Sequence, residues 1–168
     1  CKVGPGEKVA ILSSGEVRAD YAQAFLLASQ MLGADAFHLN MPPAPPAGAR
    51  YEVGKTPLHS DSPAMGALKQ ADLLIDLIGL LFSHEQNEIT ATGTRMLMVL
   101  EPFSVLQQLF PTKDQRRRVE IAGKMMENAK VMHITSPHGT DITYELQQYP
   151  VLTEYGYTDT PGRWDHFP

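Results

Sequence analysis

The chain has 168 residues, of which 43% are hydrophobic and 20% are charged, so it holds enough apolar side chains to form a folded core. Its 14 Lys and Arg residues against 19 Asp and Glu residues give a formal net charge of −5, which argues against binding to nucleic-acid phosphates. The longest apolar stretch, residues 73–82, is interrupted by Asp76 and is far shorter than the roughly 20 residues that cross a bilayer. We therefore expect a soluble protein that binds neither nucleic acid nor membrane.

The two ends of the chain are unusual. Its single cysteine, Cys1, stands where a start methionine is expected, and the chain stops at Pro168 within aromatic-rich sequence. A single cysteine forms no internal disulfide, which suits the reducing cytoplasm. We interpret the sequence as a cytoplasmic fragment of a longer protein.

The first sixty residues predict two strands, a helix and a loop. Residues 8–12 form a short apolar run that predicts a buried strand, and apolar residues at helical spacing predict a helix over 20–32. Residues 36–39 predict a second strand. The stretch 41–60 then holds four prolines within five positions, which exclude a helix or a central strand. We expect this stretch to be an exposed, mobile loop.

Strands and helices continue to alternate after this loop. Ser62 is expected to cap a helix, and Ser83 with Gln86 three residues later predicts a capping box. The expected elements are helix 63–70, strand 72–78, helix 84–93, strand 95–100, helices 103–110 and 113–128, and a fifth strand, 131–135. Residues 141–145 resemble one more strand, followed by an aromatic-rich tail.

This alternation predicts right-handed crossovers and parallel strands. We therefore expect a Rossmann-like, doubly wound α/β domain over residues 1–150, with a mostly parallel five-stranded sheet and helices on both faces.

Ligands gather at the carboxyl ends of such strands, which directs attention to the loops that follow them. None of these loops carries a glycine-rich phosphate motif, so the sequence predicts no nucleotide cofactor. Of the six histidines, none pairs with another at a His-x-His or His-x-x-x-His spacing, so we expect no metal site within this chain. His84 follows the third strand at a helix start, where it either acts on a ligand or helps to cap the helix.

The last 16 residues are the richest in groups that carry chemistry. They combine Glu154, Arg163 and His166 with several aromatic rings. Rings that stack on a ligand, with a few charged groups that orient it, are typical of a pocket for a small flat polar molecule. The alternative is an aromatic seam in which Arg163 pairs with Asp165 or Asp159, and the composition leaves both interpretations open.

Several of these motifs carry a family resemblance. They are Glu85-Gln86, Thr92-Gly93-Thr94-Arg95, Glu101-Pro102, Gln148-Tyr149-Pro150, Thr153-Glu154-Tyr155-Gly156-Tyr157 and Pro161-Gly162-Arg163-Trp164-Asp165-His166. The sequence resembles the 2,5-dihydroxypyridine 5,6-dioxygenase family of nicotinate catabolism, within the aminopeptidase T-like metalloenzyme superfamily. The resemblance covers nearly the whole chain and is most specific in the last twenty residues.

The resemblance implies that this chain is the N-terminal α/β half of a two-domain enzyme, with residues 151–168 leading into a C-terminal metal-binding domain. In the family, two histidines and an aspartate of that second domain hold a non-haem Fe(II), which activates O2. The ring of 2,5-dihydroxypyridine, or of a close hydroxylated N-heterocycle, is opened to N-formylmaleamate or its equivalent. The fragment alone is expected to be inactive.

The resemblance also implies roles for individual residues. Glu154 and His166 match family positions that contact the substrate, and Arg163 and Phe82 are expected to line the same pocket. The family's catalytic histidine is matched here by Phe82, while His84 stands two residues later. Either His84 carries the proton transfer, or the substrate differs from 2,5-dihydroxypyridine.

Two other functions stay open at this point. One is a metallo-aminopeptidase of the aminopeptidase T family, and the other is a non-catalytic oligomerisation domain. We expect a homo-oligomer in either the enzymatic or the structural case.

Overall fold

The computed structural model describes residues 1–43, 56, 58 and 62–167. The chain divides into two compact units, the first formed by residues 1–110 and 156–168 and the second by residues 111–155. The proline-rich stretch that we expect to be a loop lies largely outside the described residues. Within the described part of the chain, no helix is long and apolar enough to span a membrane.

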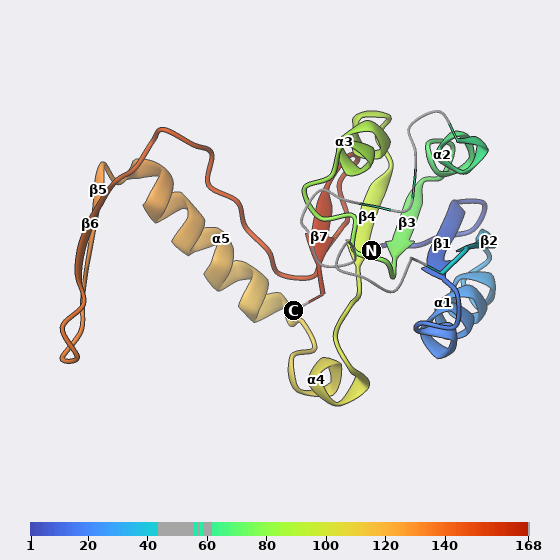
Figure 1. Cartoon of the computed structure of the whole chain (residues 1–168), viewed down its shortest axis with the longest axis horizontal. Helices are drawn as coiled ribbons and strands as arrows, with labels where there is room; N and C mark the ends of the chain where they lie inside the picture. The colour runs from blue at the N-terminus through green and yellow to red at the C-terminus, as the bar shows by residue number, and fades with distance from the viewer. Residues whose placement is uncertain (44–55, 57, 59–61, 168) are drawn as a thin grey trace. The chain divides into compact units, whose positions relative to one another are not determined.

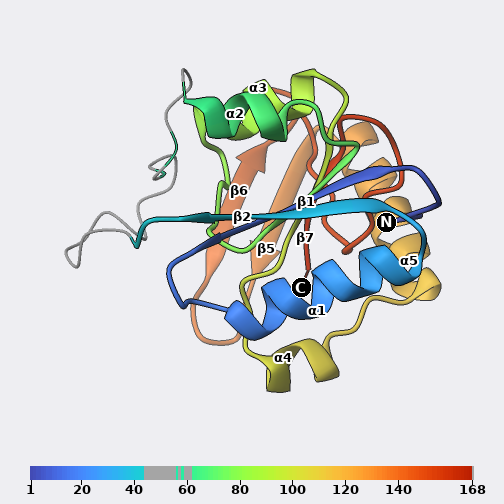
Figure 2. The same cartoon turned by 90° about the vertical axis from the view of Figure 1, so that its right-hand side faces the viewer.

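The first unit is built on a parallel sheet of five strands, which confirms the predicted α/β fold (Figures 1 and 2). The strands are β1 (Lys8–Ser14), β2 (Asp35–Met41), β3 (Leu73–Asp76), β4 (Arg95–Met98) and β7 (Trp164–His166). Their order across the sheet is β2-β1-β3-β4-β7, and every neighbouring pair is parallel. The chain therefore leaves β1 first to one side and then to the other, which is the doubly wound arrangement.

Helices cover both faces of this sheet, as predicted. The helices α2 (Pro63–Leu68) and α3 (His84–Ala91) pack on one face, against Leu12, Leu74 and Met96. The helices α1 (Ala19–Met31) and α4 (Phe103–Gln108) lie on the other face, as Figure 2 shows. Strand side chains alternate between these two apolar layers, so β1, β3 and β4 are buried on both sides.

Serine caps begin both helices of the α2–α3 face. Ser62 Oγ accepts a hydrogen bond from Met65 N at 3.3 Å, and Ser83 Oγ accepts one from Gln86 N at 3.0 Å. The predicted capping box at α3 is only half formed, because the Gln86 side chain binds Phe82 N instead of Ser83 N. The Ser83 N–H is already satisfied, since it donates to the Leu80 carbonyl at 3.0 Å.

The second unit consists of α5 (Lys113–Asn128) and a hairpin of β5 (Val131–Thr135) and β6 (Asp141–Glu145). The prediction that Val131–Thr135 is the fifth strand of the main sheet is wrong, because β5 pairs antiparallel with β6 alone. A turn of five residues joins two strands that already match each other, so the local pairing forms at little entropic cost. The fifth position in the main sheet is taken by β7, far along the chain.

Candidate functional site

A buried carboxylate lies at the carboxyl end of β3, an edge at which ligands gather in parallel sheets. Asp76 accepts hydrogen bonds from three backbone N–H groups of the next loop, at 2.9 Å from Ile78, 3.0 Å from Gly79 and 2.7 Å from Leu80. Burial raises the pKa of the Asp76 carboxyl, while these donors and the nearby His166 oppose the rise. Asp76 therefore fixes the course of the loop from β3 to α3.

Phe82 lies in the same loop and has a backbone conformation that residues other than glycine rarely adopt. Its φ is 55°, in the left-handed region, and its N–H donates to Gln86 Oε1 at 2.6 Å. The residue is 52% exposed, and its ring centroid lies 5.5 Å from that of Trp164, with an angle of 85° between the planes. The loop thus places an edge-to-face aromatic pair against β7.

His84 is the first residue of α3, two positions after Phe82. Its side chain is 77% exposed, and its Nε2 lies 3.1 Å from Glu88 Oε1, one turn along the helix. Glu88 also forms an ion pair with Lys69. The imidazole is therefore held at the exposed start of the helix by a carboxylate, which orients it for proton transfer or stabilises the helix alone.

His166 lies on β7, in one row of the sheet with Asp76 and Met98. Asp76 is the register partner of Met98, and Met98 is the register partner of His166. Partners on neighbouring parallel strands point to the same face, so His166 shares a face with Asp76 and, two residues apart along β7, with Trp164. Its Nε2 is buried and has no hydrogen-bond partner among the described residues.

Arg163 is tied to the chain around it. Its Nη2 lies 2.7 Å from Asp165 Oδ2, and its Nε donates to the Tyr157 carbonyl at 2.9 Å. Asp165 is buried and also accepts hydrogen bonds from Gly156 N at 3.1 Å and His166 N at 2.9 Å. The Arg163–Asp165 pair, one of the two pairings considered from the sequence, thus fastens the aromatic segment to β7.

Glu154 is the one predicted site residue that belongs to the second unit, where it is exposed on the segment after β6. The other four, Phe82, His84, Arg163 and His166, all belong to the first unit. Two of those four share the face of the aromatic pair: Phe82 forms the pair and His166 lies on its face. The Arg163 side chain pairs instead with Asp165, which alternates with Trp164 and His166 to the other face of β7.

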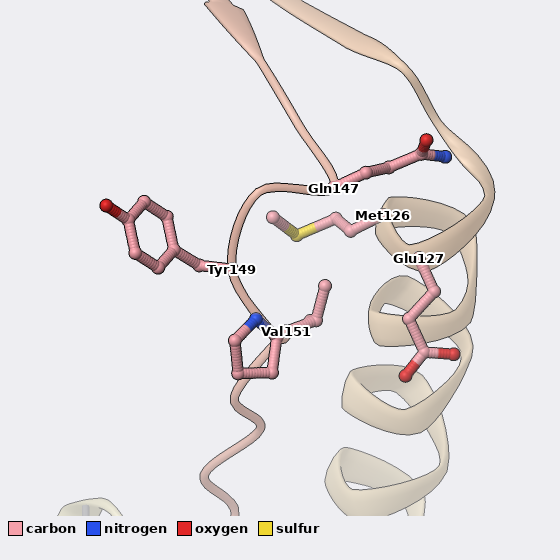
Figure 3. Close-up of a pocket in the computed structure, with 6 residues that line it drawn as sticks. Met126, Glu127, Gln147, Tyr149 and Val151 are labelled. Atoms are coloured by element: carbon pink, nitrogen blue, oxygen red, sulfur yellow. The ribbon is translucent and has the colours of Figure 1, made fainter.

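A groove of about 410 Å³ lies in the second unit, between α5 and the segment after β6 (Figure 3). It is lined by Met126, Glu127, Gln147, Tyr149, Pro150 and Val151. The lining includes none of the five predicted site residues. The described residues also contain no group of three or more His, Cys, Asp or Glu side chains that could hold a metal ion.

Comparison with known proteins decides the family. A family model described as NicX, 2,5-dihydroxypyridine 5,6-dioxygenase, matches residues 1–168. The chain belongs to this family.

The curated 2,5-dihydroxypyridine 5,6-dioxygenase of Pseudomonas putida is 39% identical to this chain over 172 residues, covering 99% of the chain and 49% of that protein. The solved structure of 2,5-dihydroxypyridine dioxygenase from Pseudomonas putida KT2440 superposes with a TM-score of 0.91 and 38% identity. That match covers 99% of this chain and 50% of the solved one. The chain thus spans about half the length of its relatives in the 2,5-dihydroxypyridine 5,6-dioxygenase family.

Three residues of this neighbourhood were not predicted as site residues from the sequence: Asp76, Gln86 and Trp164. Asp76 gave a signal, because an acidic residue in an apolar strand must be satisfied by hydrogen bonds. Gln86 had only the signal of a capping box, and its side-chain partner differs from that expectation. Trp164 belongs to the aromatic tail that indicated a pocket, but a three-residue strand carries too little alternation to show which face its side chain takes.

Proposed function

We propose that the complete protein is an Fe(II)-dependent ring-cleaving dioxygenase that opens 2,5-dihydroxypyridine with O2, and that this chain is its N-terminal half. The observation that carries the proposal is the family match over the whole chain, together with 39% identity to a curated 2,5-dihydroxypyridine 5,6-dioxygenase. A product such as N-formylmaleamate, a role in nicotinate catabolism, a cytoplasmic location and a homo-oligomeric state belong to the same proposal.

The metal ion is proposed to be held by residues of the missing half. The described residues include no cluster that fits it, so no step is assigned to this chain through the metal. When bound, Fe(II) supplies the activation of O2.

This chain contributes the wall and the polar groups of the substrate pocket. Phe82 presents its exposed ring to a planar substrate, and His166 offers its buried Nε2 to a ring nitrogen or hydroxyl. Glu154 and Arg163 are further substrate-binding groups in this proposal. His84 moves a proton of the substrate hydroxyl, with its imidazole oriented by Glu88.

The first test is O2 consumption by the full-length protein, loaded with Fe(II) under anaerobic conditions and then given 2,5-dihydroxypyridine. We expect one O2 consumed per substrate, with loss of the pyridine absorbance. An iron-loaded protein that consumes no O2 would overturn the proposal, and hydrolysis of aminoacyl amides by that protein would move it to the peptidase branch.

The second test separates His84 from the other histidines. His84→Ala should lower kcat by at least about tenfold, the scale of losing a proton-transfer group. The matched control is His138→Ala, because His138 is exposed in the β5–β6 turn. Equal kcat values for the two variants would leave His84 as a helix-capping residue only.

A further inference from the structure

Gln86 is a buried residue with a hydrogen bond at only one of the two polar atoms of its side chain. It is fully buried on α3, and its Oε1 accepts the Phe82 N–H at 2.6 Å. Because a backbone N–H needs an acceptor, the oxygen of the carboxamide must face Phe82 and the nitrogen must face away. That nitrogen, Nε2, has no hydrogen-bond partner among the described residues.

A second unpartnered nitrogen belongs to the same neighbourhood. Gln86 is bonded to Phe82, whose ring packs on Trp164, and Trp164 lies two residues before His166 on the same face of β7. His166 Nε2 is buried and without a partner in the described part of the chain. Two buried nitrogens that lack partners thus flank one aromatic pair, and buried polar groups are costly to leave unsatisfied.

The two groups call for a ligand of defined chemistry. The Gln86 amide nitrogen only donates hydrogen bonds, so its missing partner is an oxygen or another acceptor. The Phe82 and Trp164 rings offer apolar surface suited to a flat ring. Both requirements are met by a planar heterocycle that carries a hydroxyl or carbonyl oxygen.

We propose that Gln86 is a further substrate-binding residue, which donates a hydrogen bond from Nε2 to a ring oxygen of a hydroxylated N-heterocycle lying against Phe82 and Trp164. This inference rests on the proposed function for its substrate class. It also gives Gln86 a second task, since the same carboxamide holds Phe82 in its left-handed conformation. Binding of the oxygen and the position of the Phe82 ring are therefore coupled through one side chain.

The test is a comparison of binding affinities in the full-length protein without O2, so that no turnover takes place. The ligands are 2,5-dihydroxypyridine and its two analogues that each lack one oxygen, 2-hydroxypyridine and 3-hydroxypyridine. Gln86→Met, which has similar length and no amide, should weaken binding of 2,5-dihydroxypyridine by about tenfold, the scale of one hydrogen bond to a buried group. Loss of the acceptor for Phe82 N affects all three ligands alike, so the analogue that lacks the recognised oxygen should be weakened about tenfold less than 2,5-dihydroxypyridine, because it has no hydrogen bond to lose.

Ser83→Ala is the matched control for damage to the helix start. It removes the cap that accepts from Gln86 N and leaves the carboxamide in place, so it should affect all three ligands equally. If Gln86→Met does not fold, Gln86→Glu replaces it, since it keeps an acceptor for Phe82 N and removes the amide nitrogen. The loss of affinity for 2,5-dihydroxypyridine is then compared with the loss for the analogue that lacks the recognised oxygen.

The outcomes separate this inference from the proposed function. An oxygen-dependent loss in the Gln86 variant supports the inference, even if the full-length protein consumes no O2 and the proposed reaction fails. Equal changes for all three ligands, unchanged affinities, or no binding of any of them to the unmodified protein would overturn it.

Discussion

Asp76 shows how one buried carboxylate shapes the neighbourhood of the candidate site. Its two oxygens accept three backbone hydrogen bonds from the loop that leads to Phe82 and His84. A carboxylate in the interior is tolerated where several N–H groups replace its lost water. The position of the Phe82 ring and the start of α3 therefore depend on Asp76, the last residue of β3.

Asp76→Asn should lower the free energy of unfolding by about 1–3 kcal/mol, the cost of leaving a buried donor unsatisfied. The asparagine oxygen still accepts from Ile78 and Gly79, but its amide faces the N–H of Leu80, which is itself a donor. Urea unfolding measures the loss, and Asp35→Asn on exposed β2 is the control. Equal stability of the two variants would contradict this role.

The difference in free energy of unfolding between the unmodified protein and Asp76→Asn should also change with pH in a defined direction. Because the folded state raises the pKa of Asp76 above its ordinary value of 3.8, the folded protein binds this proton more tightly than the unfolded chain. The contribution of Asp76 to the free energy of unfolding is thus fully present below pH 3.8 and falls as the pH rises to the folded pKa. Asp76→Asn does not titrate at this position. The excess free energy of unfolding of the unmodified protein over Asp76→Asn should therefore become smaller as the pH rises from 3.8 to the folded pKa of Asp76. An advantage that widens with rising pH would show that the pKa is lowered instead.

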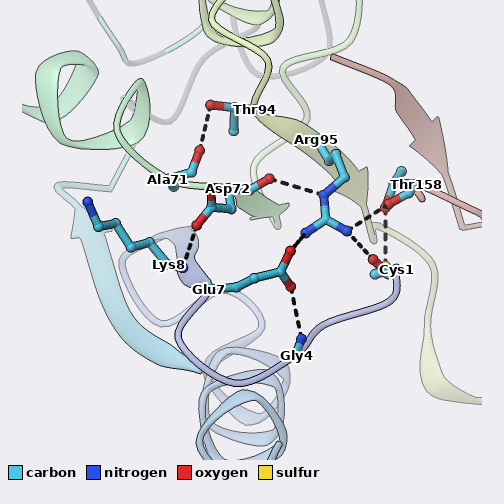
Figure 4. A network of polar contacts seen from close by, with 9 residues as sticks. All are labelled: Cys1, Gly4, Glu7, Lys8, Ala71, Asp72, Thr94, Arg95 and Thr158. Carbon is cyan, nitrogen blue, oxygen red and sulfur yellow. Dashed lines mark hydrogen bonds and ion pairs between the residues drawn. The ribbon is translucent and has the colours of Figure 1, made fainter. Parts of the chain in front are cut away.

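Arg95 is a second residue on which several segments depend (Figure 4). Its side chain is 8% exposed and forms an ion pair with Glu7 at 2.7 Å. It also donates to the carbonyls of Asp72 at 3.2 Å, Thr158 at 3.4 Å and Cys1. One guanidinium therefore links the start of the chain, the turn before β3 and the segment before β7.

Arg95→Met should lower the free energy of unfolding by about 3 kcal/mol, at the low end for a broken buried pair, because Glu7 is 31% exposed and regains water. Arg118→Met is the control, since its ion pair with Asp114 is exposed and contributes little. Thermal unfolding of both variants checks the difference. A loss for Arg118→Met as large as that for Arg95→Met would contradict it.

At the scale of elements, the sequence predicted those whose pattern is local. Strands β1, β3 and β4 are apolar runs bounded by polar loops, and Ser62 and Ser83 mark helix starts by their own chemistry. The fifth strand could not be predicted in this way, because β7 has three residues and its partner β4 lies far away in sequence. The candidate site shares this limit: the packing of Phe82 on Trp164 follows from β7 joining the sheet.

Replacing either of two helical glycines by alanine should change stability in opposite directions, because the space around the two positions differs. A Cβ at Gly66 in α2 would meet no atom within 4 Å, whereas a Cβ at Gly123 in α5 would lie 2.8 Å from Thr153 Cγ2. Gly66→Ala should therefore raise the free energy of unfolding by about 0.5–1 kcal/mol through helix propensity. Gly123→Ala should lower the stability of the second unit, because Thr153 must move.

Thermal unfolding followed by circular dichroism measures both changes. Adding Thr153→Ser to Gly123→Ala removes the Cγ2 methyl and should recover the lost stability. A Gly123→Ala variant as stable as Gly66→Ala would show that the segment after β6 does not pack on α5.

At the scale of the whole molecule, the strands of the two units differ in how many of their residues are buried. Strands β1, β3 and β4 are buried almost throughout, whereas no residue of β5 or β6 is buried. A two-stranded hairpin is only marginally stable in water without a packed face. The stability of the chain is thus concentrated in the first unit, where four of the five predicted site residues lie.

Hydrogen exchange should reveal this difference in the 168-residue chain. Amides of β1, β3 and β4 should exchange last, near the rate of global unfolding, while those of β5 and β6 should exchange first. The same measurement on the proposed full-length protein tests a second point, since the exposed strands gain protection only if the proposed C-terminal half or another copy covers them. Equal protection of the hairpin and the central strands in the 168-residue chain would contradict the division of stability. If the hairpin exchanges slowly in the proposed full-length protein but rapidly in the 168-residue chain, its exposed strands form an interface in the full-length protein.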